Sequence, residues 1–246
     1  MKSAPSRASL STASITYADP VSRYDFISII GSGSYGRVFS AADRFLAGAA
    51  VAIKSIPLEE LDDGEAARAE LAREADVLRR CDCPFIVAYH GAFYHERTLY
   101  VATALCEAGS LLDVLRAQQH LHGTASFTEP ALLAIAAGTC AALAYLHDTA
   151  HVLHRDLKAA NLLLTAHGKL QLCDFGISAQ LTSTMPNRST AIGTPHWMAP
   201  EVIGGGEYAT SADVWSLGIT MIECAQGAHL GVEPPAWKAL SARQPP

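Results

Sequence analysis

Short apolar runs alternate with polar turns between residues 24 and 106, and this pattern predicts β-strands. The predicted strands are Phe26–Ile30, Arg37–Ala42, Ala50–Ile56, 85–94 and 98–105. Between the third and fourth strands, apolar residues recur at helical spacing among acids and arginines, which predicts an amphipathic helix within residues 60–80. The front of the chain is therefore predicted to be a sheet with one helix.

From Leu111 onward the pattern becomes helical. Ala131–His147 predicts a long, buried apolar helix, and Ala212–Gln226 predicts another. Short β-like pieces surround polar loops in residues 152–175. Residues 177–200 read as one long polar loop, which in a compact domain is usually functional or disordered. A strand-rich front and a helix-rich back predict an α+β fold with two lobes.

Composition narrows the class of protein. The chain has 246 residues, of which 50% are hydrophobic and 17% charged, so it can bury a substantial core. A net charge of -6 argues against nucleic acid or an anionic membrane as the main partner. No apolar stretch is expected to reach the roughly 18 uncharged residues that a membrane-spanning helix needs.

Neither the cysteines nor the histidines predict a zinc site. Cys81 and Cys83 have no second pair after them, which a site of two cysteine pairs would need. His147, His151 and His154 straddle a helix end and a strand, so we expect no common face for them. The six scattered cysteines are typical of reduced, largely buried thiols in a cytosolic protein, so we expect a cytoplasmic location.

The two ends of the chain differ from its middle. Residues 1–23 are rich in Ser, Ala and Thr, and we expect a disordered tail there, although a transit peptide has a similar composition. Residues 228–246 lack periodicity, so we expect a second, irregular tail. The folded domain is expected to span residues 24–227.

A glycine-rich loop follows the first predicted strand. Ile30 ends that strand, and the next six residues are Gly31, Ser32, Gly33, Ser34, Tyr35 and Gly36. Glycines allow backbone N–H groups to approach phosphates closely. A dinucleotide-binding fold would continue directly into a helix, but Arg37 and Val38 begin another strand, and the GK[ST] ending of a P-loop is absent. We expect a hairpin that covers phosphates, with a purely structural hairpin as the alternative.

Lys54 ends the apolar run Val-Ala-Ile on the next strand. A buried cation is costly unless it is paired, although a lysine in such a strand often points to solvent. The helix that follows carries acids that could hold Lys54 while the lysine holds phosphate oxygens. By composition these candidates are Glu65, Glu70, Glu74 and Asp76.

The most informative stretch begins at His154 and places Asp156, Lys158 and Asn161 within six residues between two apolar runs. A carboxylate can accept or orient a hydroxyl proton. A lysine can neutralise a migrating phosphoryl group, and an asparagine oxygen can bind magnesium. Asp174, in Asp-Phe-Gly, supplies a carboxylate oxygen for magnesium shortly afterwards.

Together these motifs resemble a eukaryotic protein kinase over residues 24–227. The resemblance implies an N-lobe at about 24–104, a C-lobe at about 107–227, and an enzyme that uses ATP and Mg²⁺ to phosphorylate protein substrates. Ala199-Pro-Glu201 would end the activation segment, and Asp213 would begin the large central helix.

Individual residues acquire roles through this resemblance. Lys54 and Glu74 would form the ion pair that positions the phosphates. Asp156 would orient the acceptor hydroxyl while Lys158 screens charge. The metal ligands would be Asn161 and Asp174.

The resemblance also places an adenine pocket beside the glycine-rich loop Ile30–Val38. Val38 and Ala52 would cover the ring, Leu163 would lie beneath it, and Thr103 would guard the space behind it. The hinge would offer backbone groups of Ala104 and Cys106.

The segment Gly193–Ile203 resembles the germinal-centre kinase group, and Gln180–Thr194 resembles its Hippo-type members. Lys158 together with Thr194 is typical of serine/threonine kinases. Ile177 would favour threonine acceptors over serine.

The same resemblance implies a way of activation. Thr190 would be phosphorylated, in trans by a second copy of the chain, and Arg155 would receive the phosphate through charge-assisted hydrogen bonds. Thr194 would pack against Asp156 and Lys158 and shape the substrate site.

The resemblance stops after Gly227. In the family, Glu201 pairs with an arginine of the final helices, and the only arginine after Glu201 is Arg243. Loss of one partner of a buried ion pair costs about 3–5 kcal/mol, and apolar surface on the central helix would be uncovered. The alternative function is therefore an ATP-binding, catalytically weak scaffold or a truncated kinase fragment.

Overall fold

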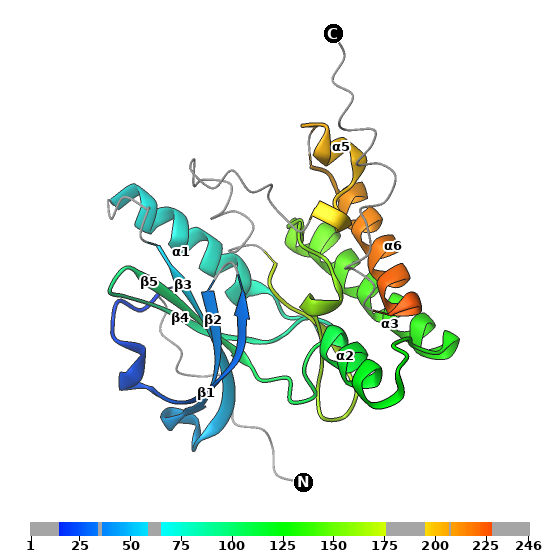
Figure 1. Cartoon of the computed structure of the whole chain (residues 1–246). Helices are drawn as coiled ribbons and strands as arrows, with labels where there is room; N and C mark the ends of the chain where they lie inside the picture. The colour runs from blue at the N-terminus through cyan, green and yellow to red at the C-terminus, as the bar shows by residue number, and fades with distance from the viewer. Residues whose placement is uncertain (1–14, 34–35, 59–64, 176–194, 207, 228–246) are drawn as a thin grey trace. The chain divides into compact units, whose positions relative to one another are not determined.

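The computed structural model describes residues 15–33, 36–58, 65–175, 195–206 and 208–227, without the side chains of residues 65–71, 74 and 195. The chain divides into two compact units. The first comprises Met1–Asp82 and Ala88–Leu105, and the second comprises Cys83–Val87 and Cys106–Pro246. Five strands belong to the first unit and most helices to the second (Figure 1). The predicted α+β fold with a strand-rich and a helix-rich part is confirmed.

The first unit is an antiparallel five-stranded sheet with one helix. Its strand order is β1-β2-β3-β5-β4. The strands are β1 (Tyr24–Gly33), β2 (Gly36–Asp43), β3 (Ala49–Pro57), β4 (Tyr89–His95) and β5 (Thr98–Ala104). Helix α1 (Glu65–Arg80) packs against β4. Strand β4 begins later than the predicted residue 85, because Phe85 and Val87 form backbone hydrogen bonds with Leu172 of the second unit instead (2.8 and 3.0 Å).

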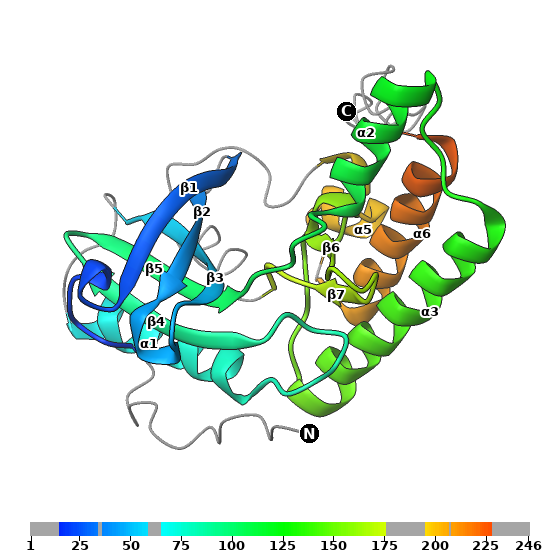
Figure 2. The ribbon, with the colours of Figure 1, turned by 90° about the horizontal axis from the view of Figure 1, so that it is seen from below.

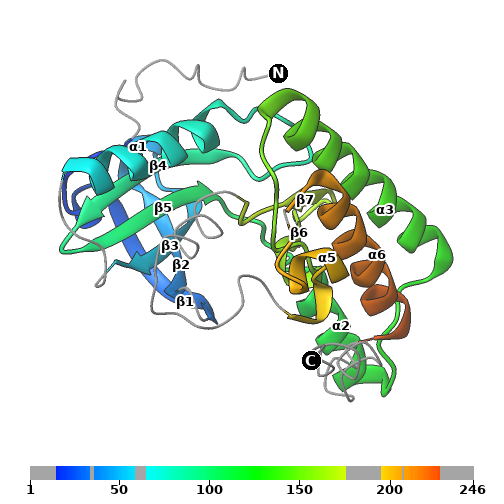
Figure 3. The ribbon, with the colours of Figure 1, turned by 90° about the horizontal axis from the view of Figure 1, so that it is seen from above.

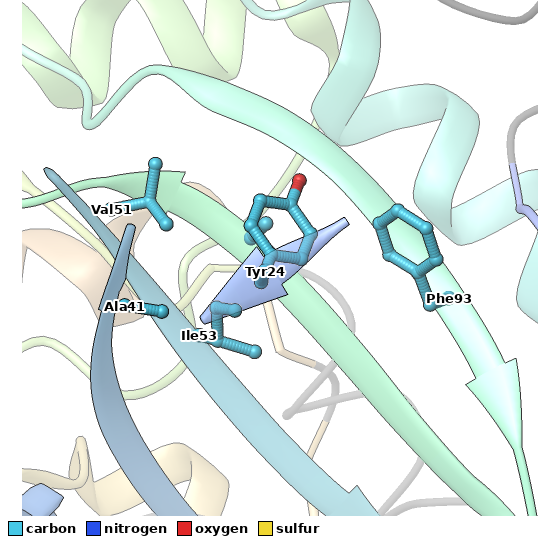
Figure 4. Close-up of a cluster of buried hydrophobic side chains, with 6 residues drawn as sticks. Tyr24, Ala41, Val51, Ile53 and Phe93 are labelled. Carbon is cyan, nitrogen blue, oxygen red and sulfur yellow. The ribbon is translucent and has the colours of Figure 1, made fainter. Parts of the chain in front are cut away.

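One face of this sheet carries an apolar cluster. Its members are Tyr24, Ala41, Val51, Ile53, Phe93 and Ala102. Figure 4 shows the rings of Tyr24 and Phe93 close together, and their centroids lie 5.4 Å apart in an edge-to-face arrangement. Side chains alternate between the two faces of a strand, so Ala52 and Lys54 project from the opposite face of β3.

Residues 15–22 are ordered against the sheet, which differs from the expected tail over residues 1–23. Ile15 is buried. The N–H of Thr16 donates to the carbonyl of Ala92 (2.9 Å), and the N–H of Tyr94 donates to the carbonyl of Thr16 (3.0 Å). The segment therefore satisfies backbone groups on the open edge of β4.

Two 3-10 turns close the far end of the β1–β2 hairpin. They are η1 (Pro20–Ser22) and η2 (Arg44–Leu46), whose N-caps are Asp19 and Asp43. Asp43 is fully buried and accepts hydrogen bonds from Arg23 Nε (3.0 Å) and Arg23 Nη2 (2.6 Å). The N–H of Phe45 also donates to Asp43 (2.9 Å). One buried carboxylate thus joins the turn to the residue before β1.

The second unit is built mainly from helices. Its elements are α2 (Leu111–His122), α3 (Glu129–Ala144), the π-helical turn η3 (Tyr145–Ala150), η4 (Ala159–Asn161), β6 (Leu162–Leu164), β7 (Leu170–Leu172), η5 (Pro195–Trp197), α5 (Pro200–Ile203) and α6 (Thr210–Gln226). Helices α3 and α6 lie side by side (Figures 2 and 3). Helix α2 begins with a capping box in which Ser110 and Asp113 bond each other's backbone N–H.

Helix α3 is only partly buried. Ile135, Thr139 and Leu143 face the interior, whereas Leu133 is 65% exposed. The segment Glu129–Ala150 is long and apolar enough to cross a membrane by length and composition alone, which corrects the expectation that no such stretch exists. A core helix passes the same test, and α3 packs against α6 and β7.

The predicted uncovered surface on the central helix is present. Within α6, Asp213, Leu217 and Thr220 are buried, whereas Val214 and Ile222 are more than half exposed. Glu201 is exposed, and within the described residues it has no ion-pair partner. The penalty expected for a buried, unpaired Glu201 therefore does not apply, because water solvates its carboxylate.

The predicted polar loop over residues 177–200 is helical at its end, in η5 and at the start of α5. Proline 200 sits in the first turn of α5, where its missing N–H costs nothing. Residues 176–194 lie outside the described residues.

All six cysteines are free thiols. Cys81, Cys106 and Cys224 are buried, and Cys140 is exposed. Burial, with a smaller effect of the neighbouring acid, raises the pKa of Cys106 to about 11 and that of Cys224 to about 12. Both thiols are therefore protonated at neutral pH and unreactive.

Candidate active site

A short antiparallel ladder in the second unit brings two predicted metal ligands to the same end. Leu162 on β6 pairs with Leu172 on β7. Asn161 precedes Leu162, and the N–H of Cys173 donates to the carbonyl of Asn161 (3.0 Å). Asp174 follows Cys173, so the chain order at this ladder places it beside Asn161.

Two side chains donate hydrogen bonds to the carboxylate of Asp156, one from the loop before η4 and one from η4 itself. Lys158 Nζ donates to both oxygens of Asp156, at 3.1 and 2.8 Å. Asn161 Nδ2 donates to the backbone carbonyl of Asp156 (2.6 Å) and to its Oδ2 (3.1 Å). The predicted trio of Asp156, Lys158 and Asn161 is therefore brought together.

Asp213, on α6, holds the backbone of this loop through hydrogen bonds. Its fully buried carboxylate accepts the N–H of His154 (2.8 Å) and the N–H of Arg155 (2.9 Å). The hydroxyl of Tyr208 (2.9 Å) and Nε2 of His147 (2.8 Å) complete its shell. A loop lacks the hydrogen bonds of a regular ladder. The bonds from His154 and Arg155 to Asp213 therefore fix the shape of this loop, and the bonds from Tyr208 and His147 hold the Asp213 carboxylate in place.

His154 is held as a neutral imidazole. Its Nε2 lies 3.0 Å from the carbonyl of Cys173, which can only accept, and its Nδ1 accepts the N–H of Asp156 (3.2 Å). One ring nitrogen therefore donates and the other accepts, which is the neutral form. Burial lowers the pKa of His154, partly opposed by the charge of Asp213.

A second buried acid supports the other side of the loop. Glu223 on α6 accepts the N–H of Ala159 (3.0 Å) and the indole N–H of Trp197 (2.9 Å). Burial raises the pKa of Glu223, although these two hydrogen bonds oppose the shift. Asp213 and Glu223 together anchor both ends of the loop to one helix.

Two non-glycine residues of the site have left-handed backbone angles. The φ of Arg155 is +67° and that of Asp174 is +62°. Such angles cost about 1–3 kcal/mol and persist where surrounding contacts enforce them. The bond from Arg155 N–H to Asp213 is one such contact. The Arg155 guanidinium lies 5.7 Å from the centroid of the Tyr208 ring.

In the first unit, the predicted nucleotide residues share one face of the sheet. Val38 pairs with Lys54 across β2 and β3, and Ala52 pairs with Thr103 across β3 and β5. Directly paired residues project from the same face. This face is opposite the one that carries Ile53 and the apolar cluster.

The glycine-rich loop is a hairpin, as predicted. Gly31, Ser32 and Gly33 end β1, and Gly36 begins β2. A Cβ on Gly36 would lie 1.8 Å from the carbonyl oxygen of Ser55, and its φ is +126°, so only glycine fits. Ser34 and Tyr35 lie outside the described residues.

The hinge residues differ in their backbone hydrogen bonds. The N–H of Ala104 donates to the carbonyl of Ala88 (2.8 Å). A ligand could therefore bond to the carbonyl of Ala104 but not to its N–H. The N–H of Cys106 has no hydrogen-bond partner among the described residues. Leu163 lies on β6, half-buried.

One of the four acids proposed as the partner of Lys54 is engaged elsewhere. Asp76 forms ion pairs with Arg79 (2.6 Å) and with Arg80, so its carboxylate is already committed. Glu74 lies on α1, and its side chain is outside the described residues. Thr190, Thr194 and Ile177 also lie outside them.

The oxygen ligands at one end of the β6–β7 ladder suit magnesium. Asn161 and Asp174 offer an amide oxygen and a carboxylate oxygen, and Mg²⁺ is commonly held by one or two such groups while phosphates and waters fill its other positions. Within the described residues, no group of three or more His, Cys, Asp or Glu side chains is arranged to hold a metal.

Sequence reasoning missed most of the residues that hold the loop from His154 to Ala159 in place. Tyr208, Glu223 and Trp197 were not predicted to have a role, and His147 was considered only as a metal ligand. The sequence did contain one signal, the acid Glu223 inside an apolar helix. A buried acid needs hydrogen-bond donors, so its presence there predicts donors nearby.

Comparisons with known proteins agree with this geometry. The protein kinase domain family matches residues 24–235. The chain is 41% identical to serine/threonine-protein kinase 1 of Arabidopsis thaliana over 87% of its length and 24% of the relative. It is 40% identical to serine/threonine-protein kinase cst-1 of Caenorhabditis elegans over 85% of its length and 39% of the relative. The chain thus spans about a quarter of the first relative and about two-fifths of the second. A match over most of its length shows that the chain belongs to the protein kinase domain family.

Proposed function

We propose that the chain is a serine/threonine protein kinase that transfers the γ-phosphoryl group of ATP to hydroxyl groups of proteins, with threonine favoured. The observation that carries this proposal is the Asp156 carboxylate, held by Lys158 and Asn161 in a loop that Asp213 fixes. Both relatives above are named serine/threonine-protein kinases.

In the proposed reaction, Asp156 accepts a hydrogen bond from the acceptor hydroxyl and directs its oxygen toward the phosphorus. Lys158 Nζ, already within 2.8 Å of Asp156, adds positive charge near the transferred group. His154 contributes no charge here, because its ring is neutral and both nitrogens are bonded. The loop is thus arranged in advance and needs little reorganisation.

Protein kinases generally use ATP and Mg²⁺, and the residues present fit both. Mg²⁺ would neutralise phosphate charge, held by Asn161 and Asp174. Lys54, paired with Glu74, would contact the phosphates, and the sheet face that bears Val38, Ala52 and Thr103 would receive the adenine. Val38 and Ala52 give part of that face an apolar surface, which supports this role.

Regulation by phosphorylation is part of the proposal. Phosphate on Thr190, added in trans by a second copy, would be bound by Arg155, and Thr194 would shape the substrate site. The stacked position of Arg155 on Tyr208 supports a guanidinium held ready for an anion. We also propose a cytoplasmic location and protein substrates as partners.

The test is phosphate transfer by the purified chain to a basic acceptor protein with ATP and Mg²⁺. Asp156→Ala should lower turnover by roughly 10²–10⁴ while the melting temperature stays close to that of the parent chain. Asp148→Ala, which removes an exposed carboxylate on η3, is the matched control and should leave turnover unchanged. Equal turnover in Asp156→Ala and the parent would exclude Asp156 from the reaction.

A second candidate is an ATP-binding scaffold with weak catalysis. The exposed apolar face of α6, with Val214 59% and Ile222 51% exposed, favours it because such surface often marks a protein contact. In that case ATP with Mg²⁺ would raise the melting temperature of the parent chain, and no phosphate would reach the acceptor protein.

A further inference from the structure

A cavity of about 500 Å³ opens on the sheet of the first unit, on the face that carries the apolar cluster. Its lining includes the rings of Phe26, Phe39 and Tyr100. The Phe26 ring meets Phe39 and Tyr100 edge-on, with centroids 5.2 and 6.4 Å apart. The side chains of Val38, Ala52 and Thr103 project from the other face, and of the predicted nucleotide residues only Gly36, at the start of β2, lines this cavity. The cavity therefore lies on the face of the sheet opposite the predicted adenine site.

The register of the strands explains why the surface is hollow. Arg37 pairs with Ser55, and Ser55 pairs with Tyr100, so these three residues form a row across β2, β3 and β5. The row places the small Ser55 between two large side chains. The turn η1 and its N-cap Asp19 line one side of the cavity, and Pro57, at the end of β3, also lines it. A small residue between large ones leaves space that the protein itself does not fill.

Two polar groups at the cavity have no side-chain partner among the described residues. Arg37 is exposed, and its guanidinium forms no ion pair or hydrogen bond with any described residue. The hydroxyl of Tyr100 likewise has no hydrogen bond there. In contrast, Asp19 already accepts the N–H of Val21 (2.9 Å) and lies 3.9 Å from His95 Nε2. The cavity groups without a protein partner among the described residues are therefore two hydrogen-bond donors, and one of them carries a positive charge.

The aromatic rings of the cavity and the donor groups of Arg37 and Tyr100 together favour a particular kind of ligand. Aromatic rings favour a further ring that packs edge-on or offset against them. A guanidinium favours a carboxylate, which it can bind through two parallel hydrogen bonds. A volume of about 500 Å³ lies within the usual range of ligand pockets and holds a ring with its neighbouring residue.

We propose that this cavity binds a short segment of a partner protein in which an aromatic side chain is followed by an acidic residue. The ring fills the space against Phe26, Phe39 and Tyr100, and the carboxylate accepts hydrogen bonds from Arg37 and the Tyr100 hydroxyl. Arg37 and Val21 at the rim are exposed, so a side chain that belongs to a larger protein can enter. The site is independent of the proposed catalytic function.

The test uses the full chain without nucleotide, labelled with ¹⁵N, and three capped hexapeptides. The sequence Gly-Ser-Trp-Asp-Glu-Gly carries both features, while one control replaces Trp with Ala and the other replaces Asp-Glu with Asn-Gln. The first peptide should shift the amide signals of Phe39, Ser55 and Tyr100 and bind at least fivefold more tightly than either control. Equal binding of all three peptides, or no shift at these amides up to millimolar peptide, overturns the proposal.

Variants then separate the two features. Arg37→Gln should weaken binding of the first peptide about fivefold to tenfold, and Tyr100→Phe, which keeps the ring, should weaken it about two- to fourfold. Arg116→Gln on α2, another exposed arginine, is the matched control and should have no effect. Unchanged binding in both cavity variants overturns the proposal, and Tyr100→Phe decides alone if Arg37→Gln does not fold.

A dilution series of the ¹⁵N-labelled chain without peptide identifies a competing occupant. Signals of Phe39, Ser55 and Tyr100 that move with protein concentration would mean that a second copy fills the cavity, which contradicts a foreign partner. Signals that stay constant from about 10 to 500 μM agree with the proposal.

Discussion

Each unit contains a fully buried aspartate, and the two are satisfied in different ways. Asp43 in the sheet unit faces the guanidinium of Arg23, which contributes three of its hydrogen bonds. Asp213 in the helical unit faces two backbone N–H groups, a tyrosine hydroxyl and a histidine. The first arrangement neutralises a charge, whereas the second uses a charge to organise a loop.

The difference follows from what surrounds each carboxylate. Strands β1 and β2 satisfy their own backbone through the ladder, so Asp43 only joins a turn to Arg23. The loop from His154 to Ala159 has no ladder, and Asp213 supplies acceptors for the backbone N–H groups of His154 and Arg155. In this protein, the buried carboxylate that faces backbone N–H groups fixes a loop, whereas the one that faces a guanidinium mainly joins two side chains.

Removal of Asp213 should have the largest effect. Asp213→Ala leaves the N–H groups of His154 and Arg155 without an acceptor, and we expect the free energy of unfolding to fall by at least about 3 kcal/mol. Turnover should fall as well, because the loop that carries Asp156 is no longer fixed. Chemical unfolding and phosphate transfer measure the two effects, and Asp148→Ala should change the stability by less than about 0.5 kcal/mol.

Asp43→Asn should cost less, because the Arg23 side chain keeps 13% exposure and can reach water. We expect a loss of about 1–3 kcal/mol in chemical unfolding. Asp25→Asn is the matched control, since its pair with Arg44 is about half exposed on both sides and solvent screens it, so the loss of stability should be much smaller. Equal losses in the two variants would contradict the importance of burial.

Tyr208→Phe removes a single hydrogen bond to Asp213 and keeps the ring beneath Arg155. We expect a loss of roughly 1.5 kcal/mol, measured by chemical unfolding, because three donors to Asp213 remain. A loss as large as that of Asp213→Ala would show that the hydroxyl alone maintains the loop.

The neutral state of His154 should appear in the pH dependence of stability. Its pKa is lowered in the folded protein, so below the ordinary value of about 6.5 the unfolded chain binds the proton first and stability falls with decreasing pH. The slope is at most about 1.4 kcal/mol per pH unit. His154→Gln removes the titrating group, so the difference between the two unfolding curves from pH 7.5 to 5 should show this slope. Glu223, whose raised pKa acts in the opposite direction, is present in both proteins.

Periodic features could be predicted from the sequence, and isolated contacts could not. The strands and the long helices follow from alternation and helical spacing, and the trio around Asp156 follows from its motif. The partners of Asp213 come from positions 5 to 66 residues away, which no local pattern reveals. Ile15 and Thr16 lie in a Ser- and Ala-rich stretch, where nothing in the composition marks a residue that pairs with β4.

The pairing of Thr16 with β4 also has a consequence for aggregation. The family match begins at residue 24, but the edge of the sheet is covered from Ile15. A fragment trimmed to residue 24 would leave β4 as an open edge, which invites strand-to-strand association between molecules. Light scattering should show such a fragment assembling over time, whereas a fragment that begins at Ile15 stays dispersed.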